Sequence, residues 1–260
     1  MLILLPPSEG KAVPRRGRPI DLAKLSLPEL NPARERTLAA LVDLCSSADA
    51  ERARQALGLS AGQHEDVVRN AALWSAPTAP ARSVYTGVLY QALDFNALSP
   101  PAKRLATRSL LIFSGLWGVL RTTDRIPSYR CSIGVRLPGP GALGAYWRKA
   151  LTQPITDLAG RGVVLDLRSS GYLGAWTPPA PVAGRTVTVR VVQERLVGGA
   201  PTRIVVSHFN KATKGRLVRD LLEAGASPRT PAALVRTLKE LGYQVELTTP
   251  LALDVVVSDV

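Results

Sequence analysis

The sequence is poor in the residues that build metal sites and disulfide frameworks. Two cysteines, Cys45 and Cys131, and two histidines, His64 and His208, occur among 260 residues. Two cysteines cannot form a disulfide framework. The absence of any CxxC or HxxxH spacing argues against a zinc finger or a zinc enzyme, and we expect no metal site. Aromatic residues make up only 5 % of the chain, which argues against a single-stranded nucleic-acid platform of many stacked rings.

Long apolar runs are also missing. Met1–Leu5 is apolar but ends at Pro6, and Leu251–Val257 is interrupted by Asp254. A transmembrane helix needs about 20 apolar residues, and a signal peptide needs a basic start and a longer apolar stretch. We therefore expect a soluble, cytoplasmic protein with no membrane partner, and a monomer.

Acidic residues are scarce in the middle of the chain. The net charge is +13, and residues 101–150 hold nine basic residues against Asp124 alone. Residues 161–220 add a net charge of +7. Such an excess attracts polyanions and speeds their encounter. Three explanations remain open: a basic surface that keeps the protein soluble, a nucleic-acid partner, or a small phosphorylated ligand.

The hydrophobic pattern mixes strands and helices. Apolar or alternating runs predict strands, and spacings of three and four residues predict helices. The expected strands are 1–5, 109–113, 163–167, 186–193, 203–207 and 243–247. The expected helices are 33–45, 49–57, 63–74, 84–93, 101–107, 146–158, 211–224 and 231–241. Proline-rich residues 12–33 are expected to form a loop or arm. The mixture predicts an α+β or α/β fold.

Three segments are candidates for anion binding. Lys11 ends a glycine-containing turn after the first strand, where backbone N–H groups and an ammonium can face an anion; a plain surface turn is the alternative. Arg121, Arg125 and Arg130 surround Asp124, and one carboxylate cannot neutralise three guanidinium groups. The alternative is a structural Arg121–Asp124 pair.

The third segment is a helix that follows a strand and carries Lys211 and Lys214 in its expected first turn, with Arg216 close behind. Cations there oppose the helix dipole, so the placement favours a bound anion at the helix start.

Two weaker signals remain. Residues 49–57 and 63–74 have the layout of a helix-hairpin-helix element, which holds a phosphate by backbone contacts. The net charge of −1 over 49–74 favours two ordinary packed helices instead. Arginines near Cys131 can lower the pKa of its thiol, but neither histidine is near it in sequence.

Several sequence blocks, taken together, resemble one family. They are Met1–Lys11, Val84–Gly87, Ser114–Arg121 with Asp124, Tyr129–Arg130 with Gly134, Tyr146–Trp147, Asp166–Tyr172 and Lys211–Arg216. In this order they resemble the YaaA family of peroxide stress resistance proteins. The start departs from that family, because Pro-Pro-Ser-Glu-Gly-Lys11 replaces its usual Ser-Pro-Ala-Lys-Thr.

The resemblance implies a single α+β domain over residues 1–260, with a mixed sheet, surrounding helices, a basic cleft and a helix-hairpin-helix-like segment at 49–74. It also implies protection from hydrogen peroxide, a lower level of free iron, and binding of duplex or branched DNA. Direct iron binding through Glu9, Asp124 and Asp166 is a weaker hypothesis, because no arrangement of two histidines and a carboxylate is evident.

Two hypotheses follow for the function. In the first, the protein binds DNA in the peroxide stress response through phosphate contacts from a basic cleft. Its residues are Lys11, Arg121, Arg125, Arg130, Lys211, Lys214 and Arg216. In the second, the same cleft is the active site of an enzyme acting on a nucleotide or another small anion. Its candidate catalytic residues are Lys11, Arg121, Asp124, Tyr172 and Lys211. No cofactor is evident.

Overall fold

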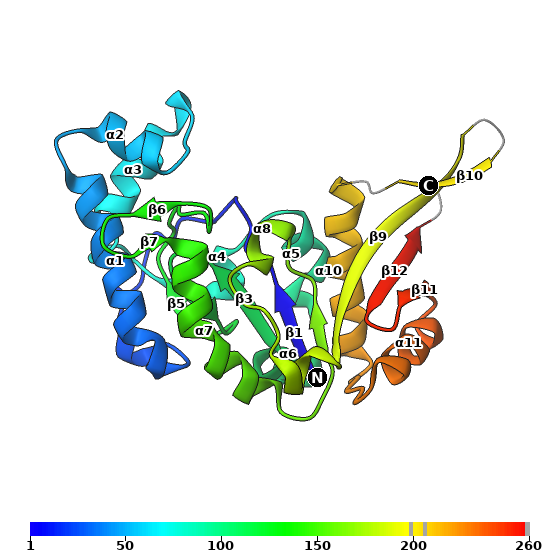
Figure 1. Cartoon of the computed structure of the whole chain (residues 1–260). Coiled ribbons are helices and arrows are strands. Elements are labelled where there is room, and N and C mark those ends of the chain that lie inside the picture. The colour runs from blue at the N-terminus through cyan, green and yellow to red at the C-terminus, as the bar shows by residue number, and fades with distance from the viewer. Residues whose placement is uncertain (198–199, 205–206, 258–260) are drawn as a thin grey trace.

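Five parallel strands form the centre of one large sheet (Figure 1). The computed structural model describes residues 1–197, 200–204 and 207–257. The strands follow the order β11-β12-β9-β8-β1-β3-β4 across the sheet, and β10 pairs with β9. The parallel strands are β12 (Ala252–Val257), β9 (Thr186–Val197), β8 (Val164–Asp166), β1 (Leu2–Leu5) and β3 (Leu110–Ser114).

Antiparallel strands complete the sheet. They are β4 (Gly118–Leu120), β10 (Ala200–Ile204) and β11 (Gln244–Thr249). Two small ladders lie outside it, and they pair β2 (Ala79–Pro80) with β5 (Arg125–Ile126), and β6 (Arg136–Leu137) with β7 (Gly141–Ala142). The expected mixed sheet with surrounding helices is confirmed.

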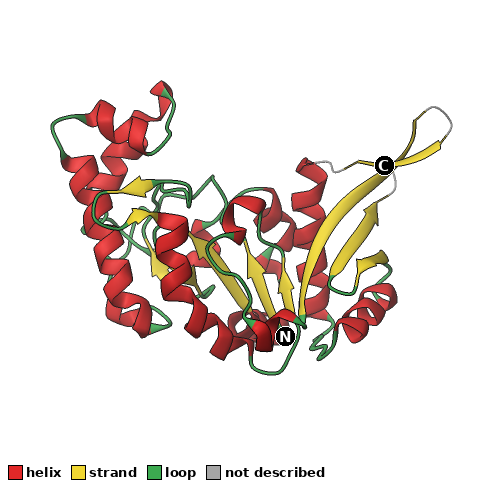
Figure 2. Cartoon of the chain, in the orientation of Figure 1, coloured by secondary structure: helices red, strands yellow, loops and turns green. Residues whose placement is uncertain are grey.

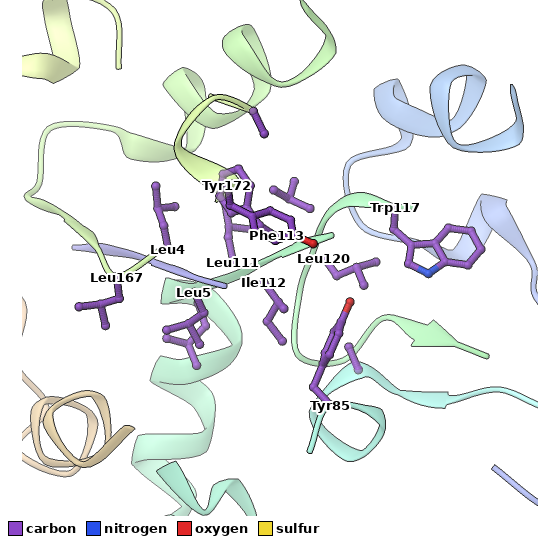
Figure 3. Close-up of a cluster of buried hydrophobic side chains, with 14 of the residues drawn as sticks. Leu4, Leu5, Tyr85, Leu111, Ile112, Phe113, Trp117, Leu120, Leu167 and Tyr172 are labelled. Atoms are coloured by element: carbon purple, nitrogen blue, oxygen red, sulfur yellow. The ribbon is translucent and has the colours of Figure 1, made fainter. Parts of the chain in front are cut away.

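The central strands form where the sequence is continuously apolar. Every residue of β1, β3 and β8 is buried, as expected for strands covered on both faces by helices. Leu4 and Leu5 of β1 and Leu111 of β3 belong to one buried cluster, which also includes Leu167 and Tyr172 (Figure 3).

Helices cover both sides of this sheet (Figure 2). Figure 1 shows α7 in front of the strands and α10 behind them, where α10 packs against α5 and α6. The longer helices are α1 (Asn31–Ser46), α3 (His64–Ala71), α6 (Pro100–Ser109), α7 (Leu143–Ala159), α10 (Ser207–Glu223) and α11 (Pro231–Glu240). The shorter ones are α2 (Ala50–Ala56), α4 (Ala81–Val84), α5 (Val88–Leu93), α8 (Ser170–Leu173) and α9 (Ala180–Ala183). Short 3-10 turns are η1 (Leu22–Lys24), η2 (Pro28–Leu30), η3 (Ala61–Gln63) and η4 (Phe95–Ala97). In the described part of the chain, no helix is both long enough and apolar enough to cross a membrane.

The two helices predicted within residues 49–74 are present as α2 and α3. Asp49 caps α2 by accepting a hydrogen bond from the Arg52 N–H at 2.9 Å. Gly58 follows the end of α2 and has a φ of +65°, a conformation that glycine adopts without strain. The helix-hairpin-helix character of the pair stays a prediction.

The start of α10 corrects one expectation. The helix begins at Ser207, within the segment expected to be a strand, and not at Lys211. Lys211 therefore follows the first turn, and Lys214 lies further along the helix. Because the helix dipole acts within the first turn, the predicted anion site at the start of this helix loses its basis. The His208 side chain and residues 205–206 lie outside what the structure describes.

A buried polar cluster ties the first hundred residues to the segment after β3. Arg34 of α1 is fully buried and donates hydrogen bonds to the carbonyl oxygens of Trp117 and Val119. Asp124 is also buried, and its Oδ1 accepts hydrogen bonds from the Ser26 N–H and hydroxyl at 2.9 and 2.7 Å. Its Oδ2 accepts one from the Arg121 N–H at 2.8 Å. These contacts support a structural role for Asp124.

Replacing Asp124 should therefore destabilise the fold. Asp124→Ala removes three hydrogen bonds and the attraction that favours the charged form of Arg34. We expect the free energy of unfolding to fall by about 3 kcal/mol, measured by denaturant titration. The exposed Asp157 of α7 gives the matched control, and Asp157→Ala should change the same quantity by less than about 0.5 kcal/mol. Equal effects would contradict the structural role.

Candidate functional site

Three loops meet at the carboxyl edge of the central strands. β1 pairs in parallel with β3 on one side and β8 on the other, with Leu4 opposite both Leu111 and Asp166. The loop after β1 leads to Lys11, the turn after β3 begins at Ser114, and the loop after β8 leads to Tyr172. The chain passes from β1 to β3, and only later returns to the other side of β1 as β8. Open α/β sheets bind ligands at the carboxyl edge beside such a reversal.

Lys11 places a cation at this edge without a carboxylate in contact. Its backbone forms a bridge with Tyr85, and its Nζ donates to the Ser8 carbonyl oxygen at 2.9 Å. The Nζ atom lies 4.5 Å from the ring centroid of Tyr129 and 5.6 Å from that of Tyr85. Within the described residues, no carboxylate lies at ion-pair distance from Lys11. A carbonyl dipole and two ring faces therefore hold the ammonium.

Burial changes the acidity of this ammonium. It lowers the pKa of Lys11 to about 8, while attraction to Glu9 opposes the shift and repulsion from Arg130 adds to it. A lysine in this range exchanges its proton near neutral pH, as a group used in binding or proton transfer must.

A chain of hydroxyl groups fixes the ring under Lys11. The Ser114 Oγ accepts hydrogen bonds from the Leu116 and Trp117 N–H groups at 3.1 and 2.9 Å. The Tyr129 hydroxyl lies 2.6 Å from the Ser114 Oγ and 2.7 Å from the Tyr85 hydroxyl. Since Ser114 already accepts two bonds, its own proton points to Tyr129. Burial raises the pKa of both tyrosines, so they stay protonated and act as positioning groups.

Arg130 provides the second cation of the site. Its guanidinium forms an ion pair with the Glu9 carboxylate at 2.9 Å, and also donates to the Glu9 carbonyl oxygen at 3.0 Å. The buried Asn70 of α3 holds the backbone of Arg130 on both sides, by accepting from its N–H at 2.9 Å and donating to its carbonyl oxygen at 2.8 Å. Helix α3 thus sets the position of Arg130.

A groove opens beside Arg130. It has a volume of about 400 Å³ and separates the turn after α2 from the loop after Arg130. Its lining consists of Glu9, Gln55, Ala56, Leu57, Gly58, Leu59, Arg130, Ser132, Gly134 and Val135. The N–H groups of Leu57, Gly58 and Leu59 already donate to carbonyl oxygens of α2. The helix-hairpin-helix hypothesis requires free backbone N–H groups at this turn. These three are already bonded and are not free to bind a phosphate.

A buried ion pair and a second lysine lie at the end of β8. Arg168 and Asp166 are both buried and lie 2.6 Å apart, and the Arg168 guanidinium stacks 4.6 Å from the Phe113 ring centroid. Lys214 of α10 donates to the Leu167 carbonyl oxygen at 3.4 Å. Burial lowers the pKa of Lys214. Tyr172 is buried nearby and burial raises its pKa, so it is not a ready base.

The remaining predicted residues lie elsewhere. Arg121 donates to the Arg108 and Leu110 carbonyl oxygens at 2.6 and 3.3 Å, at the start of β3 and so at the opposite edge of the sheet from Lys11. Arg125 lies in the ladder of β2 and β5. Lys211 and Arg216 are exposed on α10. The structure therefore brings Lys11 together with Arg130, but it does not place Arg121 beside them.

The sequence does not show the partners of these two cations. Glu9, Asn70, Tyr85, Ser114 and Tyr129 reach the site from five separate segments, and sequence spacing alone cannot show that they meet. The one available signal was the set of short motif blocks, four of which contain Glu9, Tyr85, Ser114 and Tyr129. Asn70 lies in none of them.

The structure also shows the surroundings of Cys131 and of the three carboxylates named for iron binding. Burial raises the pKa of Cys131 to about 12, so the neighbouring arginines do not produce a thiolate. Within the described ranges, no three His, Cys, Asp or Glu side chains gather as a metal centre requires. Glu9, Asp124 and Asp166 are each bound by other groups in separate places.

Comparisons with known proteins cover almost the whole chain. The family model described as "Peroxide stress protein YaaA" matches residues 1–248. A UPF0246 protein of Streptomyces coelicolor is 56 % identical over 266 residues, which covers 100 % of both chains. A UPF0246 protein of Corynebacterium efficiens is 40 % identical over 249 residues and 95 % of each chain. An uncharacterized protein of Campylobacter jejuni is 28 % identical over 218 residues, 84 % of this chain and 83 % of its own.

Lys11 should reduce the stability of the fold that holds it. A folded pKa of about 8 against an ordinary 10.5 means that the buried charge costs about 3 kcal/mol at pH 7. We expect Lys11→Met to raise the free energy of unfolding at pH 7 in denaturant titrations. Between pH 8 and 10.5 the unfolded chain binds more protons at this residue, so its contribution makes wild-type stability rise with pH and the gain from Lys11→Met shrink.

The exposed Lys239 of α11 is the matched control for this substitution. Lys239→Met should leave the stability nearly unchanged at every pH. A loss of more than about 1 kcal/mol in Lys11→Met would mean that Lys11 is a structural residue.

Proposed function

Because the chain belongs to the family of the peroxide stress protein YaaA, we propose that it serves the response to peroxide stress by binding and converting a small anionic substrate beside Lys11. The substrate carries a phosphate or carboxylate group. One observation carries the proposal: a mostly buried lysine, with no described carboxylate in contact, lies at the carboxyl edge of the central parallel strands.

The two cations divide the task of binding. Arg130 presents a planar guanidinium, which matches the oxygen pairs of phosphate and carboxylate groups. In the structure the Arg130 guanidinium binds the carboxylate of Glu9, a residue of the loop after β1. The Glu9 side chain is 69 % exposed. An incoming anion takes the place of this carboxylate at Arg130. Glu9 then swings into solvent without breaking any strand.

Lys11 supplies the chemistry. Its charged form stabilises negative charge on the substrate, and its pKa of about 8 lets it take or give a proton at neutral pH. Tyr129, held by Ser114 and Tyr85, limits the movement of the ammonium. The groove beside Arg130 has a volume of about 400 Å³, which suits a small molecule and supports the small-substrate hypothesis over duplex binding at this place.

The proposal predicts a characteristic pH dependence of anion binding. We expect the affinity for sulfate, an anion whose own charge is constant over this range, to fall at least fivefold from pH 7 to 9 in calorimetry, because Lys11 loses its proton through a pKa of about 8. Lys11→Arg keeps its charge over this range and should show a flat profile. A wild-type affinity that does not change over the same range would contradict the assignment.

DNA binding is the second candidate, and the uneven charge of the chain supports it. The net charge is +13. Lys211 and Arg216 are exposed on α10, and neither forms an ion pair within the described residues. Contacts from such residues go to phosphates, and they bind DNA without reading its sequence.

The DNA hypothesis predicts a steep dependence on salt. Each phosphate contact adds about 0.9 to the slope of log affinity against log salt. We expect the double variant Lys211→Ala, Arg216→Ala to lower that slope by about 2 for a short duplex, measured by fluorescence anisotropy. The double variant Arg236→Ala, Lys239→Ala on α11 removes the same charge elsewhere and should retain the slope. An equal decrease of the salt slope in the two double variants would show that DNA affinity depends only on the total charge of the protein.

A further inference from the structure

A cavity of about 890 Å³ lies beside residues 17–25. These residues belong to the proline-rich segment before α1, called the arm below. It shares no lining residue with the groove at Arg130. Its volume falls in the range of small-molecule sites, about 300 to 1,000 Å³. The lining includes Arg18, Ile20, Asp21, Leu25, Thr78 and Arg125.

The arm is fastened at both ends of this cavity. At its entry, the Arg18 carbonyl oxygen accepts hydrogen bonds from the Thr78 N–H and hydroxyl at 3.1 and 2.8 Å. At its exit, Ser26 donates twice to the buried Asp124. Thr78 and Asp124 directly precede β2 and β5, which pair with each other. The arm is therefore held against the paired strands β2 and β5 at two points. The cavity between them is formed without a ligand.

Gly17 makes the entry contact possible. Its φ is +141°, and a Cβ atom added there would lie 2.3 Å from the Thr78 carbonyl oxygen. No side chain fits at that distance, so the close approach of arm and ladder depends on glycine.

The charges around the cavity are unbalanced. Asp21 is the one acidic residue in the lining, and it is already bound by Lys24 at 2.7 Å and by the Ala23 N–H at 3.2 Å. Arg125 donates to the Thr78 carbonyl oxygen at 2.6 Å. Across the described residues, neither Arg125 nor Arg18 forms an ion pair. Two guanidinium groups thus remain available to an anion.

The other part of the lining is apolar. Ile20 packs against the core, Leu25 is buried, and Pro19 lies beside them. We propose that this cavity binds a small amphipathic anion, one with a carboxylate, sulfonate or phosphate group on an apolar body. The apolar body lies against Ile20 and Leu25, and the anionic group faces Arg18 and Arg125. This site is independent of the function proposed for Lys11.

Two fluorescent probes test the proposal on the full chain. Anilinonaphthalene sulfonate is an amphipathic anion, and N-phenyl-1-naphthylamine has a similar apolar body without charge. We expect one-to-one binding of the anionic probe, with a Kd that rises about tenfold in Arg18→Ala. The Kd of the neutral probe should stay unchanged in that variant. Arg18→Ala removes no described side-chain hydrogen bond, so the fold stays intact.

Two further variants make the outcome decisive. Arg236→Ala removes an exposed charge on α11 and should leave both Kd values unchanged. Gly17→Ala should weaken both probes together by lifting the arm from Thr78, while circular dichroism shows a native fold. Failure to saturate, or equal affinity of the anionic probe for wild type and Arg18→Ala, would overturn the proposal. So would binding of both probes to Gly17→Ala with wild-type affinity.

Discussion

The parallel pairing of β1 with β3 and β8 is the constraint on which the site depends. β1 begins at the second residue of the chain, yet it occupies the centre of the sheet between strands that follow more than a hundred residues later. Parallel neighbours on both sides force the loops after all three strands to one edge. Lys11, Ser114 and Tyr172 meet there for that reason, although no local sequence pattern links them.

The fold uses its buried charges in two different ways. Arg34 and Arg168 are fully or almost fully buried, and each is surrounded by carbonyl or carboxylate oxygen atoms. Such groups fix a structure, because each nitrogen of both guanidinium groups has at least one acceptor. Lys11 differs, since its ammonium has one carbonyl acceptor and two aromatic faces in the described structure. An incompletely satisfied buried cation costs stability, and this makes Lys11 a candidate for function.

Local sequence patterns predicted most elements of the fold but not their assembly. The apolar runs at Met1–Leu5 and Val163–Leu167 became β1 and β8, and Pro231 with Gly242 marks the limits of α11 as expected. Strand β12 (Ala252–Val257) is not among the expected strands, although its run of valines is typical of one. The helix α10 begins earlier than expected, because the short apolar run within Arg203–Ser207 is typical of a strand.

The candidate site could be predicted only in part, for a physical reason. The excess charge in the middle of the chain indicates anion binding, and the sequence motifs place both Lys11 and Arg130 among the candidates. Sequence charge does not show direction, so Arg121 was grouped with them although its side chain binds the opposite end of β3. The contacts of Asn70 with Arg130 and of Ser114 with Tyr129 join distant or intervening segments, and they follow from the topology of the sheet.

The pKa of Lys11 is the most direct test of this account. It can be measured by an NMR titration of lysine side chains labelled at Cε, with Lys11→Arg to assign the signal among the lysines. We expect a pKa of about 8 in the free protein and a higher value in saturating inorganic phosphate, because a bound anion favours the charged form. A pKa near 10.5 that phosphate does not change would contradict the central claim that Lys11 is a buried anion-binding group.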